Sequence, residues 1–387
     1  MFSRRTGWNL TKNAFTLALE RHQHAGRELF DLTVSNPTRV GLEGSRHILA
    51  ALAKPEALDY DPQPRGSLRA RESVVAYYRA LGVEICAEQT ILTTSTSEAY
   101  SFLFRLLCDP EDEVLIPSPS YPLFEFLADI QDVRLVPYEL VYDHGWQIDF
   151  HSLRKSISSR TRAVIVVNPN NPTGSYVKAA EQQELNRLCR EHELALLADE
   201  VFFDFNLSKV KFDSFATNQA ALTFTMSGLS KIAGLPQMKV AWIATTGPTN
   251  VAEEAIEKLE VIADTYLSVN APIQQAIPEL LASSDDFQQQ LKVRLHENLG
   301  ELDRQLRGQQ LCSRLQVEGG WYAILRVPVT RTDEELVIEL LELRDVLVHP
   351  GHFFNFHADR YLILSLMTTP AVFAEGTKRL LACLNSA

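Results

Sequence analysis

The middle of this chain alternates short apolar runs with segments of helical periodicity, and this alternation restricts the possible fold more than any other sequence feature. The apolar runs have the length of strands, and the stretches between them repeat apolar residues at helical spacing, as around 99–107. Continuous apolar strands separated by helices are typical of a parallel sheet that helices cover on both faces. The predicted strands are 91–93, 113–116, 133–136, 162–167, 194–198, 222–225 and 240–244.

The pattern changes beyond Pro248. A long helical pattern starts there, contains a break near 270–272, and gives way to a mixed region of helices and strands. A chain of 387 residues is too long for one ordinary core, so we expect two domains. We predict an α/β fold in which residues 51–275 form a large domain with a mostly parallel sheet flanked by helices. Residues 1–50 and 276–387 then form a smaller α+β domain with an N-terminal arm.

The composition argues against several classes of partner. The formal net charge of -12 disfavours binding to nucleic acid or to an anionic membrane surface. The five cysteines include no Cys-x-x-Cys pair, which favours reduced thiols over disulfides or a zinc site. No apolar run approaches the length of a membrane span, and the N-terminal arginines precede no signal-peptide core. We therefore expect a cytoplasmic protein whose ligands are small molecules.

Four polar segments follow predicted strands, at the end where open α/β sheets bind ligands. They are 94–99, 168–174, 199–201 and 227–231. Each has an ordinary interpretation when it is taken alone: a helix cap, a turn, a second cap and a solvated lysine. Together they supply a helix start for a phosphate, an amide, a carboxylate and a lysine. Pyridoxal phosphate requires this combination, because lysine provides the imine and the carboxylate keeps the ring nitrogen protonated.

These motifs resemble those of the class I/II aminotransferases, the large family with the aspartate-aminotransferase fold. The segments Asn168-Pro169-Asn170-Asn171-Pro172-Thr173-Gly174, Asp199-Glu200-Val201 and Ser230-Lys231 occur in the family's order. The resemblance extends from Asp31 to about Gly376. It implies a transaminase that uses pyridoxal 5'-phosphate to move an amino group from an amino acid to a 2-oxo acid.

The resemblance also implies roles for individual residues. Lys231 is similar to the lysine that forms the cofactor imine and then moves the substrate proton, and Asp199 to the partner of the ring nitrogen. Asn36 belongs to a segment that resembles the family's substrate-side loop. The other expected cofactor contacts are Tyr121 on the ring face and Asn171 and Phe202 near the ring oxygen. The residues expected at the phosphate are Ser95, Thr96, Ser97, Ser230 and Lys239.

Tyr60 resembles the tyrosine that reaches the phosphate of a neighbouring subunit. The resemblance therefore implies that each active site needs two chains. The expected working unit is therefore a homodimer.

Four positions depart from the family's pattern. Lys239 stands where arginine is usual, Gly228 where serine or threonine is common, and Phe202 where a tyrosine normally faces the ring oxygen. Ile363 occupies the position of the arginine that clamps the substrate α-carboxylate. Because isoleucine cannot pair with a carboxylate, another residue must do so, or the substrate is held differently. Arg39 is the first candidate for this role and Arg360 is the second.

Three histidines, His349, His352 and His357, lie in one short segment. No carboxylate or cysteine pattern accompanies them, so we expect them at the mouth of the site or in a structural role rather than on a metal. Other readings of the whole chain also exist. β-Lyases and decarboxylases share the fold, and a non-catalytic sensor of the same fold is a further possibility. Such sensors carry a DNA-binding domain, for which a resemblance starting near Asp31 leaves no room.

Overall fold

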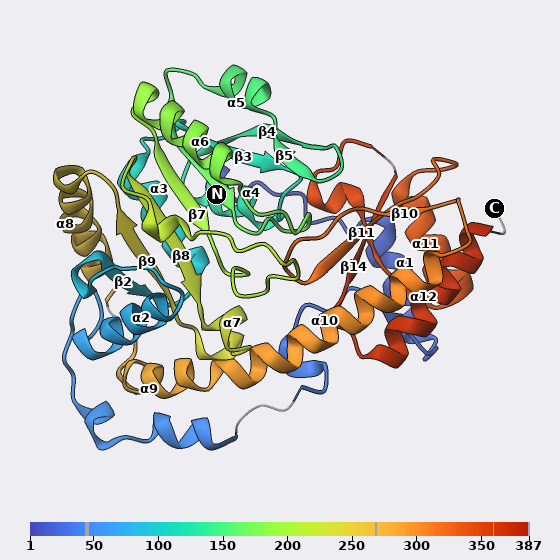
Figure 1. The fold of residues 1–387 in the computed structure, drawn as a ribbon, viewed down its shortest axis with the longest axis horizontal. Helices are drawn as coiled ribbons and strands as arrows, with labels where there is room; N and C mark the ends of the chain where they lie inside the picture. Colours follow the sequence, from blue (N-terminus) through green and yellow to red (C-terminus); the bar gives the residue numbers. More distant parts are fainter. Residues whose placement is uncertain (43–45, 268, 359, 386–387) are drawn as a thin grey trace.

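The computed structural model describes residues 1–42, 46–267, 269–358 and 360–385. Two sheets dominate it, a large sheet with helices around it and a small one near the C-terminus (Figure 1). The long helix α10 (Ser284–Leu306) runs from the side of the large sheet to the small sheet. The chain therefore has the predicted α/β architecture.

The large sheet has eight strands in the order β2-β9-β8-β7-β6-β3-β4-β5. The five neighbouring strands from β8 to β4 are parallel, whereas β5 and β9 run antiparallel to their neighbours. The strands are β2 (Thr90–Thr93), β3 (Glu113–Ser118), β4 (Arg134–Tyr142), β5 (Trp146–Ile148), β6 (Thr161–Val167), β7 (Ala195–Asp199), β8 (Thr223–Gly228) and β9 (Ala241–Thr246).

All seven predicted strands are present, and two features of the sheet differ from the prediction. The edge strand β5 was not predicted, since its three residues follow β4 after a tight turn and give no periodic signal. β9 is antiparallel to β8, although its apolar run suggested a parallel strand. The connection 229–240 contains only two short helical turns, so the chain reverses direction instead of crossing over the sheet.

Helices cover both faces of the large sheet. Successive residues of β7 belong to different hydrophobic clusters, with Leu196 packed towards one face and Leu197 towards the other. This alternation explains why the strands read as continuous apolar runs. The helices of the large sheet are α2 (Leu68–Ala80), α3 (Thr96–Leu107), α4 (Leu123–Ile130), α5 (Phe150–Ser156), α6 (Ala179–His192), α7 (Leu229–Ile232), α8 (Thr249–Tyr266) and α9 (Ala271–Ala282).

The small sheet is antiparallel, with strand order β10-β11-β14-β13. Its hydrophobic cluster takes in α10 and also Phe202 and Phe205, which follow β7, so this cluster joins the two sheets. The boundaries of the two domains remain a prediction. The remaining strands and helices are α1 (Ala14–His24), β1 (Phe30–Asp31), β10 (Ser313–Arg314), β11 (Tyr322–Arg326), α11 (Asp333–Arg344), β12 (Val346–Leu347), β13 (His349–Pro350), β14 (Tyr361–Ser365) and α12 (Pro370–Asn385).

The helical pattern beyond Pro248 forms three helices, with the expected break between α8 and α9 and a second one at Ser283. Within the described residues, no helix combines the length and apolar character needed to cross a bilayer. Short 3-10 helices occur at Arg4–Thr6, Pro37–Arg39, Arg46–Leu52, Pro55–Leu58, Ala87–Gln89, Phe215–Thr217, Pro236–Met238 and Gly351–Phe354.

Candidate active site

Strand register brings the polar segments to one edge of the large sheet. Thr93 at the end of β2 and Gly228 at the end of β8 both pair with Ala241 of β9, so the three residues form one row. In the neighbouring strands, Asp199 pairs with both Val167 and Met226. The chain segments that follow β2, β6, β7 and β8 therefore emerge side by side, as the sequence predicted.

A cavity of about 310 Å³ lies at this edge. It contains most of the residues that the sequence placed at the cofactor. The predicted residues that line it are Ser95, Thr96, Ser97, Tyr121, Asn171, Asp199, Phe202, Ser230 and Lys231.

Lys231 lies on the single-turn helix α7 directly after β8. Burial lowers the pKa of its ammonium group to about 8, and the charge of Asp199 only partly opposes this effect. A substantial fraction of the side chain is therefore an uncharged amine at mildly alkaline pH. Such an amine can attack a carbonyl carbon or accept a proton.

Asp199 is the last residue of β7 and is 8% exposed. Burial raises the pKa of its carboxyl group to about 6, while hydrogen bonds and the charge of Lys231 act in the opposite direction. The hydrogen bonds come from the backbone N–H of Val201 at 3.2 Å and the hydroxyl of Tyr100 at 3.2 Å. A cation beside this carboxylate would hold it in the ionised form.

The N-terminus of α3 opens into the same cavity. Ser95 caps the helix, since its hydroxyl accepts a hydrogen bond of 3.1 Å from the backbone N–H of Glu98. Thr96 and Ser97 belong to the first turn, and Ser230 of α7 also lines the cavity and brings a hydroxyl. Backbone N–H groups at a helix start, together with hydroxyls, form a common site for a phosphate group.

The three asparagines of the loop after β6 differ in their hydrogen bonds: two of them stabilise the loop, and the third lines the cavity. Asn168 donates to the carboxylate of Glu200 at 2.9 Å and accepts from the N–H of Val177 at 3.0 Å, so it fixes the loop. The side-chain oxygen of Asn170 accepts from the hydroxyl of Thr173 at 3.0 Å. The buried side-chain oxygen of Asn171, in contrast, has no hydrogen-bond partner in the described parts of the chain, and this residue lines the cavity.

Four predicted site residues lie outside the cavity lining. Lys239 is exposed and ends the connection before β9, and Tyr60 is 80% exposed. Asn36 uses its side chain to cap the 3-10 helix at Pro37–Arg39, and Arg39 is exposed. Within the single chain, these four side chains therefore do not join the nine predicted residues that line the cavity.

Sequence reasoning missed several residues of the cavity. Tyr100, the donor to Asp199, lies four residues after Thr96 on α3, and this helical spacing could have identified it. Ser35 and Tyr322 come from opposite ends of the chain and give no local signal. The apolar wall formed by Leu123, Phe124 and Leu127 was also not predicted.

Ile363 is fully buried in β14, where it pairs with Ile324 on one side and His349 on the other. Arg360 is exposed just before this strand. Among the described residues that line the cavity, Lys231 is the only one with a basic side chain. Within the described chain, the cavity wall therefore offers no arginine for a substrate carboxylate.

The three histidines have different surroundings. His349 packs against Phe353 and Phe354. His352 pairs with buried Asp333 at 2.7 Å, and both His352 and His357 line a second cavity. This cavity of about 340 Å³ shares Tyr121 and Phe124 with the first one. In the described residues, no three His, Cys, Asp or Glu side chains are grouped so that they could hold a metal ion.

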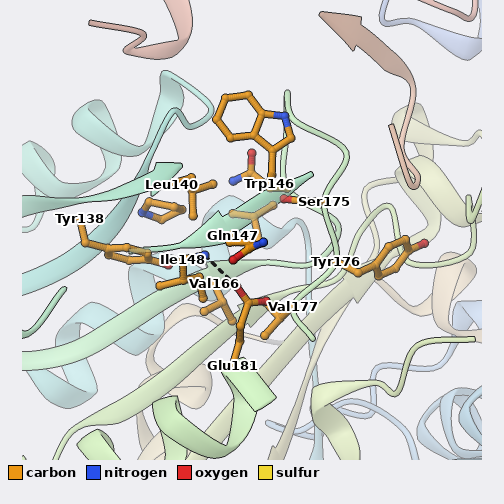
Figure 2. A pocket seen from close by; sticks show the side chains of 13 residues that line it. Tyr138, Leu140, Trp146, Gln147, Ile148, Val166, Ser175, Tyr176, Val177 and Glu181 are labelled. Carbon is orange, nitrogen blue, oxygen red and sulfur yellow. Dashed lines mark hydrogen bonds between the residues drawn. The ribbon is translucent and has the colours of Figure 1, made fainter. Parts of the chain in front are cut away.

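A third cavity lies behind the loop after β6 (Figure 2). Trp146 and Ile148 of β5 line one side, and Glu181 of α6 accepts a 2.7 Å hydrogen bond from the backbone of Ile148. The volume of about 20 Å³ is enough for a single water molecule. This cavity is therefore too small for a substrate.

Gly228 has a structural reason to lack a side chain. A Cβ atom there would lie 2.7 Å from the carbonyl oxygen of Val240 and 2.9 Å from the Cα of Ala241. We predict that Gly228→Ser destabilises the protein by about 1–3 kcal/mol, because β9 must move to admit the new atoms. Urea unfolding of the two proteins measures this change. A Gly228→Ser protein of unchanged stability with tighter cofactor binding would contradict the prediction.

Comparison with known proteins gives consistent matches across the chain. The model of the family "Aminotransferase class I and II" matches residues 30–379. The alanine aminotransferase of Mycobacterium tuberculosis is 31% identical over 381 residues, which cover 93% of this chain and 87% of that protein. A glutamate-pyruvate aminotransferase of Haemophilus influenzae is 27% identical and covers 89% of this chain and 88% of its own length.

Solved structures match the fold. An alanine aminotransferase from Pyrococcus furiosus superposes with a TM-score of 0.90 at 24% identity, and the match covers 100% of both chains. A mutant of the aspartate aminotransferase of Thermus thermophilus gives a TM-score of 0.86 at 22% identity over 99% of this chain and 100% of the other. The predicted fold class is confirmed by these similarities.

Proposed function

This chain belongs to the class I and II aminotransferases, and on that basis we propose that it works with pyridoxal phosphate bound through Lys231. The observation that carries the proposal is the single cavity that joins Lys231, Asp199, Asn171 and the N-terminus of α3. The side-chain amide of Asn171, whose oxygen has no partner among the described residues, and the backbone N–H groups in the first turn of α3 are groups that such a cofactor would engage. The donor set therefore fits the ring, the ring nitrogen and the phosphate of this cofactor.

When bound, pyridoxal phosphate supplies a cationic ring that accepts the electrons left at the substrate α-carbon after deprotonation. The chain's own residues do the rest. Once the substrate amine has displaced it from the cofactor, the Nζ of Lys231 would take the proton from the substrate α-carbon and deliver it to the cofactor carbon that it had been bound to. The carboxylate of Asp199 would keep the ring nitrogen protonated, and the hydroxyl of Tyr100 donates a hydrogen bond that holds this carboxylate. Tyr121 would stack on the ring face, and the side-chain amide of Asn171 would donate to the ring oxygen.

The phosphate contacts follow from the helix start. Ser95, Thr96 and Ser97 would hold the phosphate together with Ser230. Lys239 and Tyr60 are exposed in the single chain. We assign Lys239 to the outer side of the phosphate, and Tyr60 to the site of a second chain in a homodimer.

The substrates we propose are an amino acid donor and a 2-oxo acid acceptor. Two of the relatives are named for alanine and for glutamate and pyruvate, so these compounds are the first to test. The test is the half-reaction: purified, cofactor-loaded protein is mixed with a panel of amino acids, and conversion to the pyridoxamine form is followed by absorption. Release of carbon dioxide or of a β-substituent without amino transfer would instead indicate a decarboxylase or a β-lyase.

We also propose that Arg39 binds the substrate carboxylate in place of the arginine that Ile363 replaces. Ser35 lines the cavity four residues before Arg39, and Arg39 is exposed, without a side-chain partner in the described part of the chain. Arg39→Ala should raise the amino acid concentration for half-maximal conversion roughly 10- to 100-fold, since a charged hydrogen bond contributes about 1.5–3 kcal/mol. The absorption of the bound cofactor should not change.

Arg360→Ala tests the second candidate in the same assay, and we expect no effect because Arg360 is exposed just before β14 and does not line the cavity. It should leave the concentration dependence unchanged. If Arg39→Ala also behaves like the unmodified protein, the carboxylate is bound elsewhere, and amines without an α-carboxylate should be tested as donors.

A further inference from the structure

The amine of Lys231 lies against two aromatic rings. Its Nζ is 4.8 Å from the centre of the Trp321 ring and 5.4 Å from that of Phe202. Trp321 directly precedes β11 of the small sheet, whereas Phe202 follows β7 of the large sheet. The lysine therefore lies at a junction between the two sheets.

The two rings are held firmly. Trp321 is 1% exposed and Phe202 is 5% exposed. They meet edge to face with their centres 5.1 Å apart, and Phe205 supports Trp321 from 5.2 Å. The indole N–H of Trp321 is buried and has no hydrogen-bond partner among the described residues. A polar partner therefore does not explain why a tryptophan occupies this position.

The face of an aromatic ring attracts cations, because its π electrons carry partial negative charge. It attracts a neutral amine much less. Trp321 and Phe202 therefore favour the protonated state of Lys231, as does the carboxylate of Asp199, the charged group that acts on this lysine. Burial of the amine acts in the opposite direction.

We propose that Trp321 is a positioning residue that holds the protonated amine of Lys231 against its ring face during proton transfer. This inference rests on the proposed function, in which Lys231 takes a proton from the substrate α-carbon. The ring face stabilises the ammonium group formed in that step. It also keeps the group at the junction of the two sheets, from where the proton can return.

A purely structural role for Trp321 predicts a different result. If the ring only excluded water, a smaller side chain would admit solvent and raise the pKa of Lys231 towards its usual value. If the ring face stabilises the cation, its loss lowers the pKa. The two explanations therefore predict shifts of opposite sign.

The experiment compares Trp321→Leu and Trp321→Phe in the full chain without cofactor. Acetylation of Lys231 by acetic anhydride, measured by mass spectrometry over a pH series, gives the pKa of the amine. We expect Trp321→Leu to lower this pKa by roughly 0.5–1.5 units, and Trp321→Phe, which keeps a ring face, to lower it by less than half as much. In cofactor-loaded protein, the alkaline shoulder of the half-reaction's pH profile should move in the same direction.

Trp146→Leu is the matched control. Trp146 belongs to the same hydrophobic cluster, is 5% exposed and also has a buried indole N–H without a partner in the described residues. Its ring contacts Tyr142 and Phe356 instead of the lysine. This substitution should leave the pKa of Lys231 unchanged.

An unchanged or raised pKa in Trp321→Leu overturns the proposal, as does an equal shift in Trp146→Leu. If Trp321→Leu does not fold, Trp321→Phe and Phe202→Leu give the same test, and both must lower the pKa. The amine titration needs no turnover. If the unmodified protein shows no transaminase activity but Trp321→Leu still lowers the pKa of Lys231, the proposed function is refuted. The contact between the ring and the lysine is then still supported.

Discussion

Lys231→Ala is expected to abolish the absorption band of the lysine-bound cofactor and to slow the amino-acid half-reaction at least about 10³-fold. In the proposed function, this side chain supplies both the covalent attachment of the cofactor and the group that carries the substrate proton. Its amine is buried beside Asp199, at the end of β8. No other lysine of the described chain lines the cavity, so no other amine can take over. Absorption spectra and single-turnover kinetics measure the two effects.

The protein should stay folded in this variant, because removal of a buried amine whose charged form burial disfavours has little cost. Thermal unfolding checks this point. Lys258→Ala is the control, since Lys258 is exposed on α8, where it pairs with Glu254. It should keep both the absorption band and the rate. A Lys231→Ala protein that retains the band and turnover would refute the assignment of the site.

The residues at the centre of the candidate site could be predicted from the sequence because their positions follow a local rule. Asp199 and Lys231 each follow directly after an apolar run, and in parallel strands such positions meet at one edge. The edge strand β5 lies at the far end of the sheet from β2, β9 and β8. β9 is antiparallel to both β2 and β8, so β2 still ends at the same edge as β8, in one row with Ala241. The family, the fold class and the transaminase function implied by the resemblance are confirmed by the comparisons.

The rest of the site depends on contacts between distant segments, which no local pattern encodes. Trp321 and Tyr322 reach the cavity region from the small sheet, about 90 residues after Lys231 in the chain. Ser35 reaches it from the N-terminal segment. These positions follow from the cluster that joins the two sheets, and hydrophobic periodicity does not reveal which of its residues face a ligand. A resemblance also identifies a missing group, such as the arginine replaced by Ile363, without identifying its substitute.

The expected result for Asp199→Ala is a protein that still binds the cofactor through Lys231 but transfers the substrate proton roughly 10²–10⁴-fold more slowly. Without the carboxylate, the ring nitrogen loses its proton near neutral pH, and the ring then accepts electrons poorly. Asp199→Asn should be nearly as slow, because the amide keeps the size and loses the charge. Asp199→Glu should restore part of the rate. Unchanged kinetics in the alanine variant would mean that Asp199 only caps the backbone of Val201.

A stability measurement separates the electrostatic role of Asp199 from a structural one. Its pKa of about 6 in the folded chain lies above the ordinary carboxyl value of 3.8, so folding disfavours the charged form. The cofactor-free protein should therefore become more stable as the pH falls through 6, because the folded state then takes up a proton that the unfolded state does not. Asp199→Asn removes the part of this dependence that comes from Asp199, while that of Glu200, whose pKa burial raises to about 7, stays. The variant should be more stable than the unmodified protein at pH 8. With the cofactor bound, the unmodified protein should be the more stable of the two. The ring cation would then pair with the carboxylate, and this pairing stabilises only the unmodified protein. Urea unfolding of both proteins, with and without cofactor, measures this difference in stability. If the carboxylate served only as a cap, the cofactor would not change which of the two proteins is more stable.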